Sequence, residues 1–272
     1  MALESFPPMT LVSARFVISG ALLLGVYATL GAKMPRGADL WRTAINGIVI
    51  LGIGNGCLTL AETWIPSGLA ALIITVSPFW MLGLDAVLPP RSPLHAPTLA
   101  GLFVGLAGAA LLVGPGALEG GLSGNIAKGF LVLQLGCFSW SLGSLLQRKR
   151  ESATDPIVSA GVQQLAAGLA FLLPALLAGG PIHWSARGVG ALFYLVTFGS
   201  IVGYSSYVYA LQRLPVPVVS IYNYVNPVVA VTLGWLFYRE PFGWREAAAM
   251  IVIFAGVAIV KRAEARRTKT PA

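Results

Sequence analysis

Residues Val219 to Phe237 read VSIYNYVNPVVAVTLGWLF, a stretch long and apolar enough to cross a membrane as one helix. The same stretch carries two asparagines, two tyrosines and a proline. Polar side chains at membrane depth are costly, and they usually face the interior of a helix bundle or an aqueous cavity. The stretch therefore predicts a membrane helix with one face that serves a polar site.

The composition of the whole chain agrees with a membrane protein. Of its 272 residues, 56% are hydrophobic and 10% are charged, and the mean hydropathy is +0.78. Soluble domains carry about 25% charged residues, so the composition argues against a soluble fold. The net charge of +8 does not indicate nucleic-acid binding, because the lysines and arginines lie mainly at the ends of apolar segments.

Apolar windows of about 20 residues predict the membrane spans. Nine such windows occur, and the connections between them are too short to hold a soluble domain. We therefore expect an all-α polytopic membrane protein with nine transmembrane helices, which performs its function inside the helix bundle. The predicted spans are Met9–Leu30, Thr43–Leu60, Ser67–Leu88, Pro97–Val113, Gly129–Leu146, Ile157–Ala178, Val189–Leu211, Val216–Tyr238 and Arg245–Val260.

The basic residues predict how the chain is oriented. If the C-terminal tail lies in the cytoplasm, alternation of the spans places most of the 18 lysines and arginines on the cytoplasmic side. Met1 then lies outside. We expect a multi-pass protein of the plasma (inner) membrane whose partners are the lipid bilayer and a small-molecule solute, with no nucleic acid.

The sequence repeats itself with a spacing of almost 150 residues. Gly20 matches Gly168, 148 residues later, and Gly54 matches Gly203, 149 residues later. The first four predicted spans match the last four in order, so the fifth has no counterpart. In the complete plan five spans separate equivalent helices, which therefore cross the membrane in opposite directions, as in an inverted-topology repeat.

This repeat divides the chain into two halves. Residues 1–117 form a first repeat with four spans, residues 124–266 form a second with five, and residues 267–272 form a basic cytoplasmic tail. Inverted repeats are found in many secondary transporters, which expose a central site alternately to the two sides of the membrane.

Four segments carry a resemblance to a known family. They are PPMTLVSARFVISG, AETWIPSGLAALIITVSPFW, CFSWSLGSLLQRKR and YALQRLPVPVVSIYNYVNP, which begin at Pro7, Ala61, Cys137 and Tyr209. With them the chain resembles the EamA-type permeases of the drug/metabolite transporter superfamily. That resemblance implies ten helices in two inverted five-helix repeats, and export of small metabolites such as amino acids or drug-like solutes. The first helix of that pattern is absent, and we expect a truncated chain; the alternative is a nine-helix protein whose open flank a homodimer could cover.

The polar residues of the opening stretch are the first candidates for a solute cavity. Tyr222, Asn223 and Asn226 lie at helical spacing beside Pro227, which removes a backbone donor and predicts a kink. Two interpretations of the asparagines carry about equal weight. They contact the solute, or they form hydrogen bonds between helices, which are common in membrane bundles.

Matching positions of the two halves supply further cavity candidates. Ser77 and Pro78 correspond to Asn226 and Pro227, so a second kink is expected at Pro78. Positions within the spans add four more aromatic or amide side chains, with packing as the alternative for the tryptophans. These candidates are Asn55, which corresponds to Tyr204, and Trp80, Tyr204 and Trp140.

Three ionisable residues lie in or near the spans. Arg15 is the most costly, because its charge is not readily lost, and it either snorkels to the membrane surface or recognises a solute carboxylate. Glu62 and Asp85 are the carboxylates placed to carry a proton, although each lies near the end of a predicted span.

The sequence gives no support for catalysis or for a cofactor. Cys57 and Cys137 fall inside apolar windows, where a small weakly polar residue packs easily, so neither a disulfide nor a metal site is expected. His95 and His183 fall in separate loops, and no paired carboxylate or phosphate-binding motif occurs. A channel or a membrane scaffold is the alternative to a transporter, and an intramembrane enzyme is the weakest hypothesis.

Overall fold

A computed structural model describes residues 5–65, 67–118, 124–149, 154–177, 180–238 and 243–267. This part of the chain contains helices and no strand. Six of its helices are long and apolar enough to cross a membrane, and Ala96–Leu112 is a shorter apolar helix. The predicted all-helical membrane architecture is confirmed, and the number of nine spans stays a prediction. The six are Pro8–Thr29, Ala38–Ala61, Leu69–Val87, Ile126–Arg148, Pro156–Leu177 and Ala186–Arg213.

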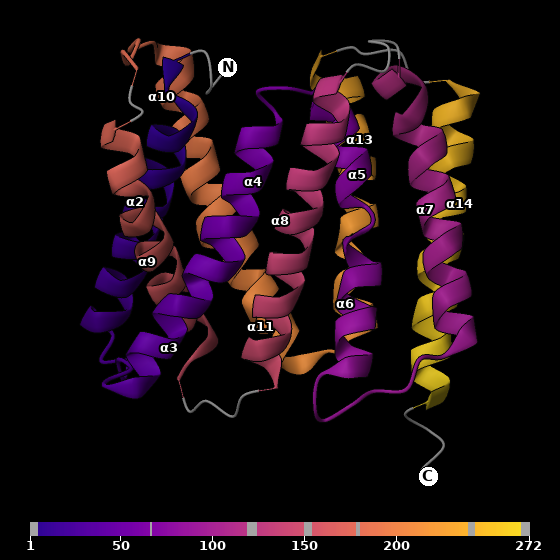
Figure 1. Ribbon diagram of the computed structural model, residues 1–272, viewed down its shortest axis with the longest axis horizontal. Coiled ribbons are helices and arrows are strands. Elements are labelled where there is room, and N and C mark those ends of the chain that lie inside the picture. The colour runs from indigo at the N-terminus through magenta and orange to yellow at the C-terminus, as the bar shows by residue number, and fades with distance from the viewer. Residues whose placement is uncertain are drawn as a thin grey trace. The chain divides into compact units, whose positions relative to one another are not determined.

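The chain forms two compact units, and each is discontinuous in sequence (Figure 1). Unit 1 consists of Met1–Leu60 and Leu142–Arg213, and unit 2 consists of Ala61–Ser141 and Leu214–Ala272. The division between them passes through helix α8 (Gly124–Arg148). The units are therefore not the two predicted repeats, because each unit takes helices from both halves of the sequence.

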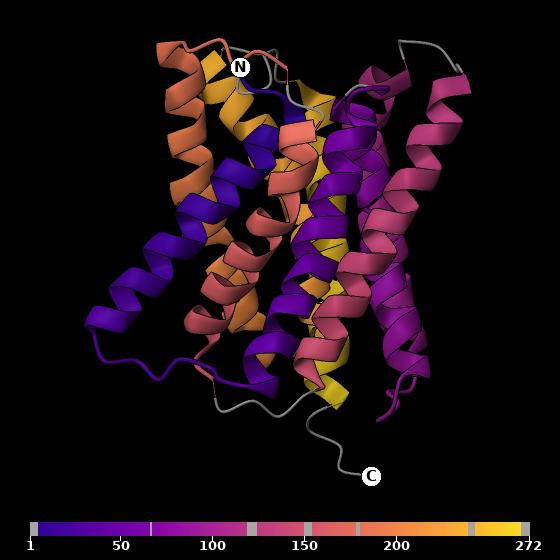
Figure 2. The ribbon, with the colours of Figure 1, turned by 60° about the vertical axis from the view of Figure 1, so that its left-hand side comes forward.

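Unit 1 begins with α2 (Pro8–Thr29), and Figure 2 shows an extended connection from α2 to α3. Two of its membrane helices contain a π-helical segment in the middle. The elements after α2 are α3 (Ala38–Gly47), η1 (Ile48–Ile53), α4 (Gly54–Ala61), the end of α8, α9 (Pro156–Leu177), α10 (Ala186–Tyr194), η2 (Leu195–Tyr204) and α11 (Ser205–Arg213).

Local signals in the sequence explain where the helices of the second half begin. Pro156 occupies the first position of α9, where its missing N–H is not needed. The carboxylate of Asp155 accepts a hydrogen bond from the backbone N–H of Ile157 (2.8 Å). Ser185 caps α10 in the same way, since its Oγ accepts from the backbone N–H of Gly188 (2.9 Å).

Helices α2 and α9 are matching helices of the two predicted repeats, and they pack against each other within unit 1. A Cβ atom on Gly20 would lie 2.5 Å from the backbone nitrogen of Leu165, and one on Gly168 would lie 2.5 Å from that of Val17. Ser13 Oγ donates to the Gly168 carbonyl (2.9 Å). Partners of later residues in α2 are earlier residues in α9, so the two helices run antiparallel, as an inverted repeat requires.

Unit 2 contains interrupted helices and a second pair of matching helices. Helices α7 and α14 pack antiparallel, because a Cβ on Gly101 would meet Val260 (2.9 Å) and one on Gly108 would meet Ile253 (2.8 Å) at their backbone nitrogens. The elements of unit 2 are α5 (Ser67–Ile74), α6 (Ser77–Val87), α7 (Ala96–Leu118), the start of α8, α12 (Val216–Ser220), α13 (Tyr222–Tyr238) and α14 (Trp244–Arg267).

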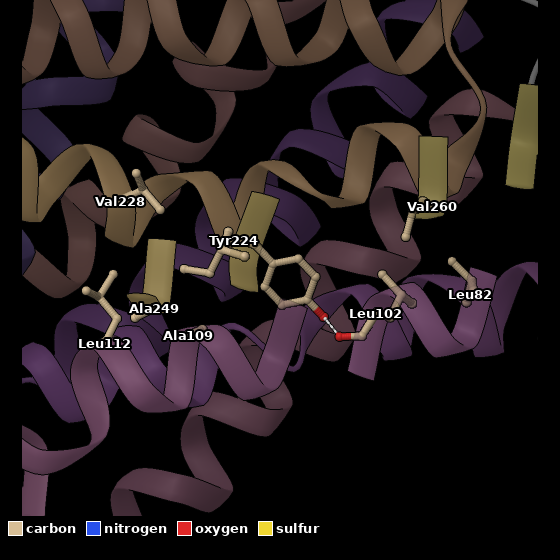
Figure 3. Packing of buried hydrophobic residues seen from close by; sticks show 9 residues of the cluster. Leu82, Leu102, Ala109, Leu112, Tyr224, Val228, Ala249 and Val260 are labelled. Atoms are coloured by element: carbon tan, nitrogen blue, oxygen red, sulfur yellow. Dashed lines mark hydrogen bonds between the residues drawn. The ribbon is translucent and has the colours of Figure 1, made fainter. Parts of the chain in front are cut away.

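An apolar cluster lies between α7, α13 and α14 (Figure 3). At its centre the fully buried ring of Tyr224 lies against Gly105, and its hydroxyl donates to the Leu102 carbonyl (3.0 Å). Lipid tails are as apolar as leucine, so close packing and hydrogen bonds between helices stabilise such a cluster. Its buried members are Leu82, Leu102, Ala109, Leu112, Tyr224, Val228, Ala249, Ile253 and Val260.

The two helices with predicted proline kinks are interrupted in unit 2. One breaks at Thr75 and Val76, directly before Pro78, which lies in the first turn of α6. The other breaks at Ile221, whereas Pro227 lies inside the continuous helix α13. In the second half the interruption therefore comes more than one turn before the proline.

Candidate functional site

A cavity of about 280 Å³ opens among the helices of unit 1. Its volume is close to the lower end for small-molecule sites, which is about 300 Å³. Ile45, Val49 and Leu146 supply apolar surface. The remaining lining residues are polar, and they come from α3, α8, α9 and α11: Arg42, Thr43, Asn46, Gln147, Ser159, Gln163 and Gln212.

A close approach of α3 to α9 shapes this cavity. Gly47, at the end of α3, lies directly against the backbone and Cβ of Gln163, so that no side chain fits there. The glycine brings α3 close enough for Asn46 to share the cavity wall with Gln163. The α9 helix contributes two adjacent buried amides, Gln163 and Gln164, and only the first of them lines the cavity.

A chain of hydrogen bonds leads from a buried tyrosine to the cavity wall. Tyr204 Oη donates to Gln163 Oε1 (2.6 Å), and Gln163 Nε2 donates to Gln147 Oε1 (3.0 Å). Asn46 Nδ2 donates to the same oxygen of Gln147 (3.5 Å). Gln147 Nε2 is buried and has no acceptor among the described residues. Leaving such a donor unpaired costs about 1–3 kcal/mol, so a bound oxygen atom would find an unused partner here.

A second tyrosine, Tyr207, joins Tyr204 to α8. The ring of Tyr207 stacks on that of Tyr204 with a centroid separation of 6.1 Å. The Tyr207 hydroxyl and Ser144 Oγ share a hydrogen bond of 2.6 Å. The two tyrosines therefore tie α11 and the end of η2 to α8 and α9, next to the amide wall of the cavity.

Both π-helical segments belong to matching helices of the two halves. The segment η1 ends one residue before Gly54, and η2 includes Gly203, which is the sequence match of Gly54. Asn55 follows η1, and its counterpart Tyr204 ends η2. π-helical turns often mark functional sites. The sequence did not predict them, because a single extra residue in a helical turn leaves the apolar pattern of a membrane helix almost unchanged.

Unit 1 contains three of the residues that the sequence singled out. Tyr204 is buried and bonded to the cavity residue Gln163, and Asn55 is half-buried in α4. Arg15 does not line the cavity, and its Nε donates to Ser200 Oγ in η2 (2.7 Å). The guanidinium also lies 5.0 Å from the ring centre of Phe16. The bond to Ser200 joins α2 to η2, and both snorkelling and carboxylate recognition by Arg15 stay predictions.

Several predicted site residues lie in unit 2, and three of them take part in hydrogen bonds. Trp80 Nε1 donates to Gln134 Oε1 (2.8 Å), and the Trp80 ring packs edge-on against Phe138. Asn223 Nδ2 donates to the Ser220 carbonyl three residues earlier (3.2 Å), at the helix interruption. The buried Ser77 accepts from Ser141 Oγ through its own backbone carbonyl (3.4 Å).

The other candidates of unit 2 differ in their exposure. Asn226 is exposed, and Tyr222 and Trp140 are half-buried. Pro78 and Pro227 are both buried. None of these five lines the cavity of unit 1, so their solute contact stays a prediction.

The two predicted proton-carrying carboxylates lie in different surroundings. Glu62 follows the end of α4, and burial raises the pKa of its carboxyl above the ordinary value. Asp85 lines a very small pocket of about 10 Å³ together with His95, Thr98 and Glu264. Thr98 Oγ1 donates to Glu264 Oε1 there (2.9 Å). That space is about the size of one water molecule, so it does not accommodate an organic solute.

The sequence search missed the residues that build the cavity wall. Asn46, Gln147 and Gln212 are amides near the ends of predicted spans, where polar residues are ordinary. The usable signal was the adjacent pair Gln163 and Gln164 inside an apolar window, since two consecutive amides at membrane depth need partners on two sides of a helix. Among the described residues, no cluster of metal-binding side chains occurs.

Comparison with known sequences identifies a family in both halves of the chain. The sequence profile of the EamA-like transporter family matches residues 1–114 and 127–262. An uncharacterised inner membrane transporter of Escherichia coli (strain K12), YedA, is 32% identical over 263 residues, which are 96% of this chain and 83% of that protein.

More distant relatives include one with a named solute class. A probable terminal-alkyne amino-acid exporter of Streptantibioticus cattleyicolor is 26% identical over 250 residues, 88% of this chain and 79% of the relative. Protein PecM of Dickeya dadantii is 24% identical over 245 residues, 89% of this chain and 80% of its own. A solved crystal structure has a TM-score of 0.79 at 21% identity and covers 93% of this chain and 88% of its own, which shows the fold alone.

Proposed function

Because the chain belongs to the EamA-like transporter family and is a multi-pass membrane protein, we propose that it exports small metabolites such as amino acids across the plasma (inner) membrane. Membership of this family makes it a membrane transporter with a small-molecule solute, and points away from an enzyme. The solute class and the direction are the proposal. The relative named as an amino-acid exporter supports both.

The observation that carries the proposal is the amide-lined cavity of unit 1. Apart from Arg42, the polar lining groups are amides and hydroxyls, which supply donors and acceptors without a charge and suit a solute whose own charges balance. Apolar lining from α3 and α8 adds contact for a hydrocarbon side chain. A polar wall with an apolar flank thus favours an amino acid over a purely apolar drug.

The matching helices support an alternating-access mechanism. Helices α2 and α9 run antiparallel, as do α7 and α14, and each pair joins equivalent members of the two halves. Inverted repeats allow one structure to adopt two related conformations that open to opposite sides. We propose residues 1–117 and 124–266 as those repeats, with the C-terminus in the cytoplasm.

A matched pair of variants tests whether the cavity serves transport. Gln163→Leu and Gln164→Leu alter adjacent residues of α9, both fully buried and both hydrogen-bonded to another helix. We expect both to lower stability, Gln163→Leu somewhat more because it removes two hydrogen bonds and Gln164→Leu removes one, each bond between membrane helices contributing about 0.6 kcal/mol on average. Only Gln163→Leu should lower the efflux of labelled neutral amino acids from cells that express the full chain.

The same efflux assay separates the alternatives. A transporter gives flux that saturates with internal solute, whereas a channel gives flux that rises linearly. If cells with the protein release no more solute than cells with an empty vector, the export proposal fails. If both glutamine variants export equally well at equal membrane abundance, export stands and the cavity is not the route.

A further inference from the structure

The cavity of unit 1 has an unbalanced set of polar groups. Arg42 contributes a guanidinium with five N–H donors, and Thr43 and Ser159 contribute hydroxyls. None of the described residues that line the cavity is acidic. Asp39 lies one turn earlier on α3 and is not part of the lining. The cavity therefore carries one positive charge with no negative charge in its wall.

Hydrogen bonds within the wall increase this imbalance. The Oε1 atoms of Gln163 and Gln147 already accept hydrogen bonds from Tyr204 and Gln163, respectively. Two of the amide oxygens are thus occupied by protein donors. The Gln147 Nε2 donor, in contrast, has no acceptor among the described residues although it is buried. The unused group in this chain of hydrogen bonds is therefore a donor, and it needs an acceptor.

From this arrangement we infer that the cavity binds the carboxylate of its solute, with Arg42 as the charge partner and the Gln147 amide as a second donor. The inference rests on the proposed export function and assigns the chemical class of the solute and its orientation. A single guanidinium matches a monoanionic carboxylate. A phosphate monoester, at about −1.5 to −2 at pH 7, would leave charge uncompensated in this site.

The position of Arg42 fits such a role. Its side chain is exposed on α3, while the neighbouring Thr43 is buried and Asn46 lies one turn later on the same wall. Arg42 thus keeps access to solvent, where it meets an incoming carboxylate, and the buried Gln163 and the half-buried Gln147 form the deeper part of the wall. The solute's other end then contacts Val49 and Leu146.

Four matched pairs of probes test the inference without any substitution. The probes are valine, leucine, threonine and phenylalanine, each compared with its own carboxamide, which keeps the side chain and the amino group but loses the carboxylate. Purified full-length protein should bind at least one acid about tenfold or more tightly than its amide. Equal binding of acid and amide, or binding of no acid in the panel, overturns the inference.

A matched substitution locates the effect. Arg42→Gln and Arg36→Gln each remove one positive charge from exposed positions close together in sequence, and Arg36 does not line the cavity. We expect Arg42→Gln to abolish the preference for acid over amide and Arg36→Gln to keep it. If Arg42→Gln keeps the preference, Arg42 is not the charge partner. If protein-dependent efflux is the same in Arg42→Gln as in the unchanged protein, the export function stands and only this inference fails. If no protein-dependent efflux is found, both fail.

Discussion

Units 1 and 2 are built on the same plan but from different chemistry. In each, matching helices of the two halves pack antiparallel through glycines, α2 with α9 and α7 with α14. Amides and hydroxyls surround the first pair, and Ser19 Oγ donates to Gln164 Oε1 (2.5 Å) across it. Around the second pair lies the apolar cluster centred on Tyr224.

This difference separates the tasks of packing and recognition. The glycine contacts bring helix backbones together in both units, and they need no polar group. Burial of the amides in unit 1 costs desolvation free energy, which hydrogen bonds offset. A cluster of such amides around a cavity therefore favours a ligand site. Unit 2 shows what the same helix pairing looks like when close packing is its main task.

The largest expected effect concerns the apolar cluster of unit 2. Tyr224→Ala should lower the free energy of unfolding by about 3–5 kcal/mol, because it leaves a cavity beside Gly105. Tyr224→Phe, which keeps the ring and loses the bond to the Leu102 carbonyl, should cost about 0.6–1.7 kcal/mol. Thermal unfolding of the purified protein measures both. Similar losses for the two variants would show that the hydroxyl, and not packing, governs unit 2.

A single added methyl group should destabilise the glycine contacts between α2 and α9 and between α7 and α14. Gly20→Ala in unit 1 and Gly256→Ala in unit 2 place a Cβ 2.5 Å from a backbone nitrogen, that of Leu165 or of Gly105. We expect each to cost about 1–3 kcal/mol through overpacking. Gly25→Ala is the matched control on α2, since no atom lies within 4 Å of its added Cβ. If Gly25→Ala also destabilised the protein, the loss would come from α2 itself and not from the contact between helices.

Removal of the Tyr204 hydroxyl, which begins the series of hydrogen bonds to the cavity wall, should lower transport more than stability. Tyr204→Phe leaves Gln163 Oε1 without its donor, at a cost of about 1 kcal/mol. Because Gln163 then turns more freely, we expect weaker solute binding, measured as a raised half-saturation concentration for efflux. Tyr194→Phe alters an exposed tyrosine of α10 and should leave efflux unchanged. Unchanged efflux in Tyr204→Phe would separate the tyrosine from the site.

The smallest stability effect is expected at Asn226 of unit 2. Asn226 is exposed, so Asn226→Ala should change the free energy of unfolding by no more than about 0.5 kcal/mol. The sequence prediction is that it nevertheless lowers transport more than membrane insertion. Efflux divided by membrane abundance tests this, with buried Asn223→Ala as the comparison that should reduce abundance. A transport defect in Asn226→Ala would extend the solute path to unit 2 and break the contrast between the units.

The sequence by itself determined the membrane architecture, the family and the matching of the two halves. Apolar windows of span length and glycines repeated at a spacing of almost 150 residues can both be recognised in the sequence alone. The same patterns indicated Tyr204 as a buried polar residue near a site. The kinks expected at Pro78 and Pro227 stay predictions, and the helix interruptions lie at Thr75, Val76 and Ile221.

Only the tertiary structure decided which polar residues meet. Asn46, Gln147 and Gln163 come from three helices, and Asn46 is about 100 residues from the other two in sequence. The close approach of two of these helices depends on Gly47. The sequence likewise did not predict the π-helical segments or the pairing of α2 with α9. Hydrophobic periodicity indicates which face of a helix is apolar, and not which helix packs against that face. A bilayer imposes the number and length of apolar segments, whereas short-range packing and hydrogen bonding between helices choose the partners.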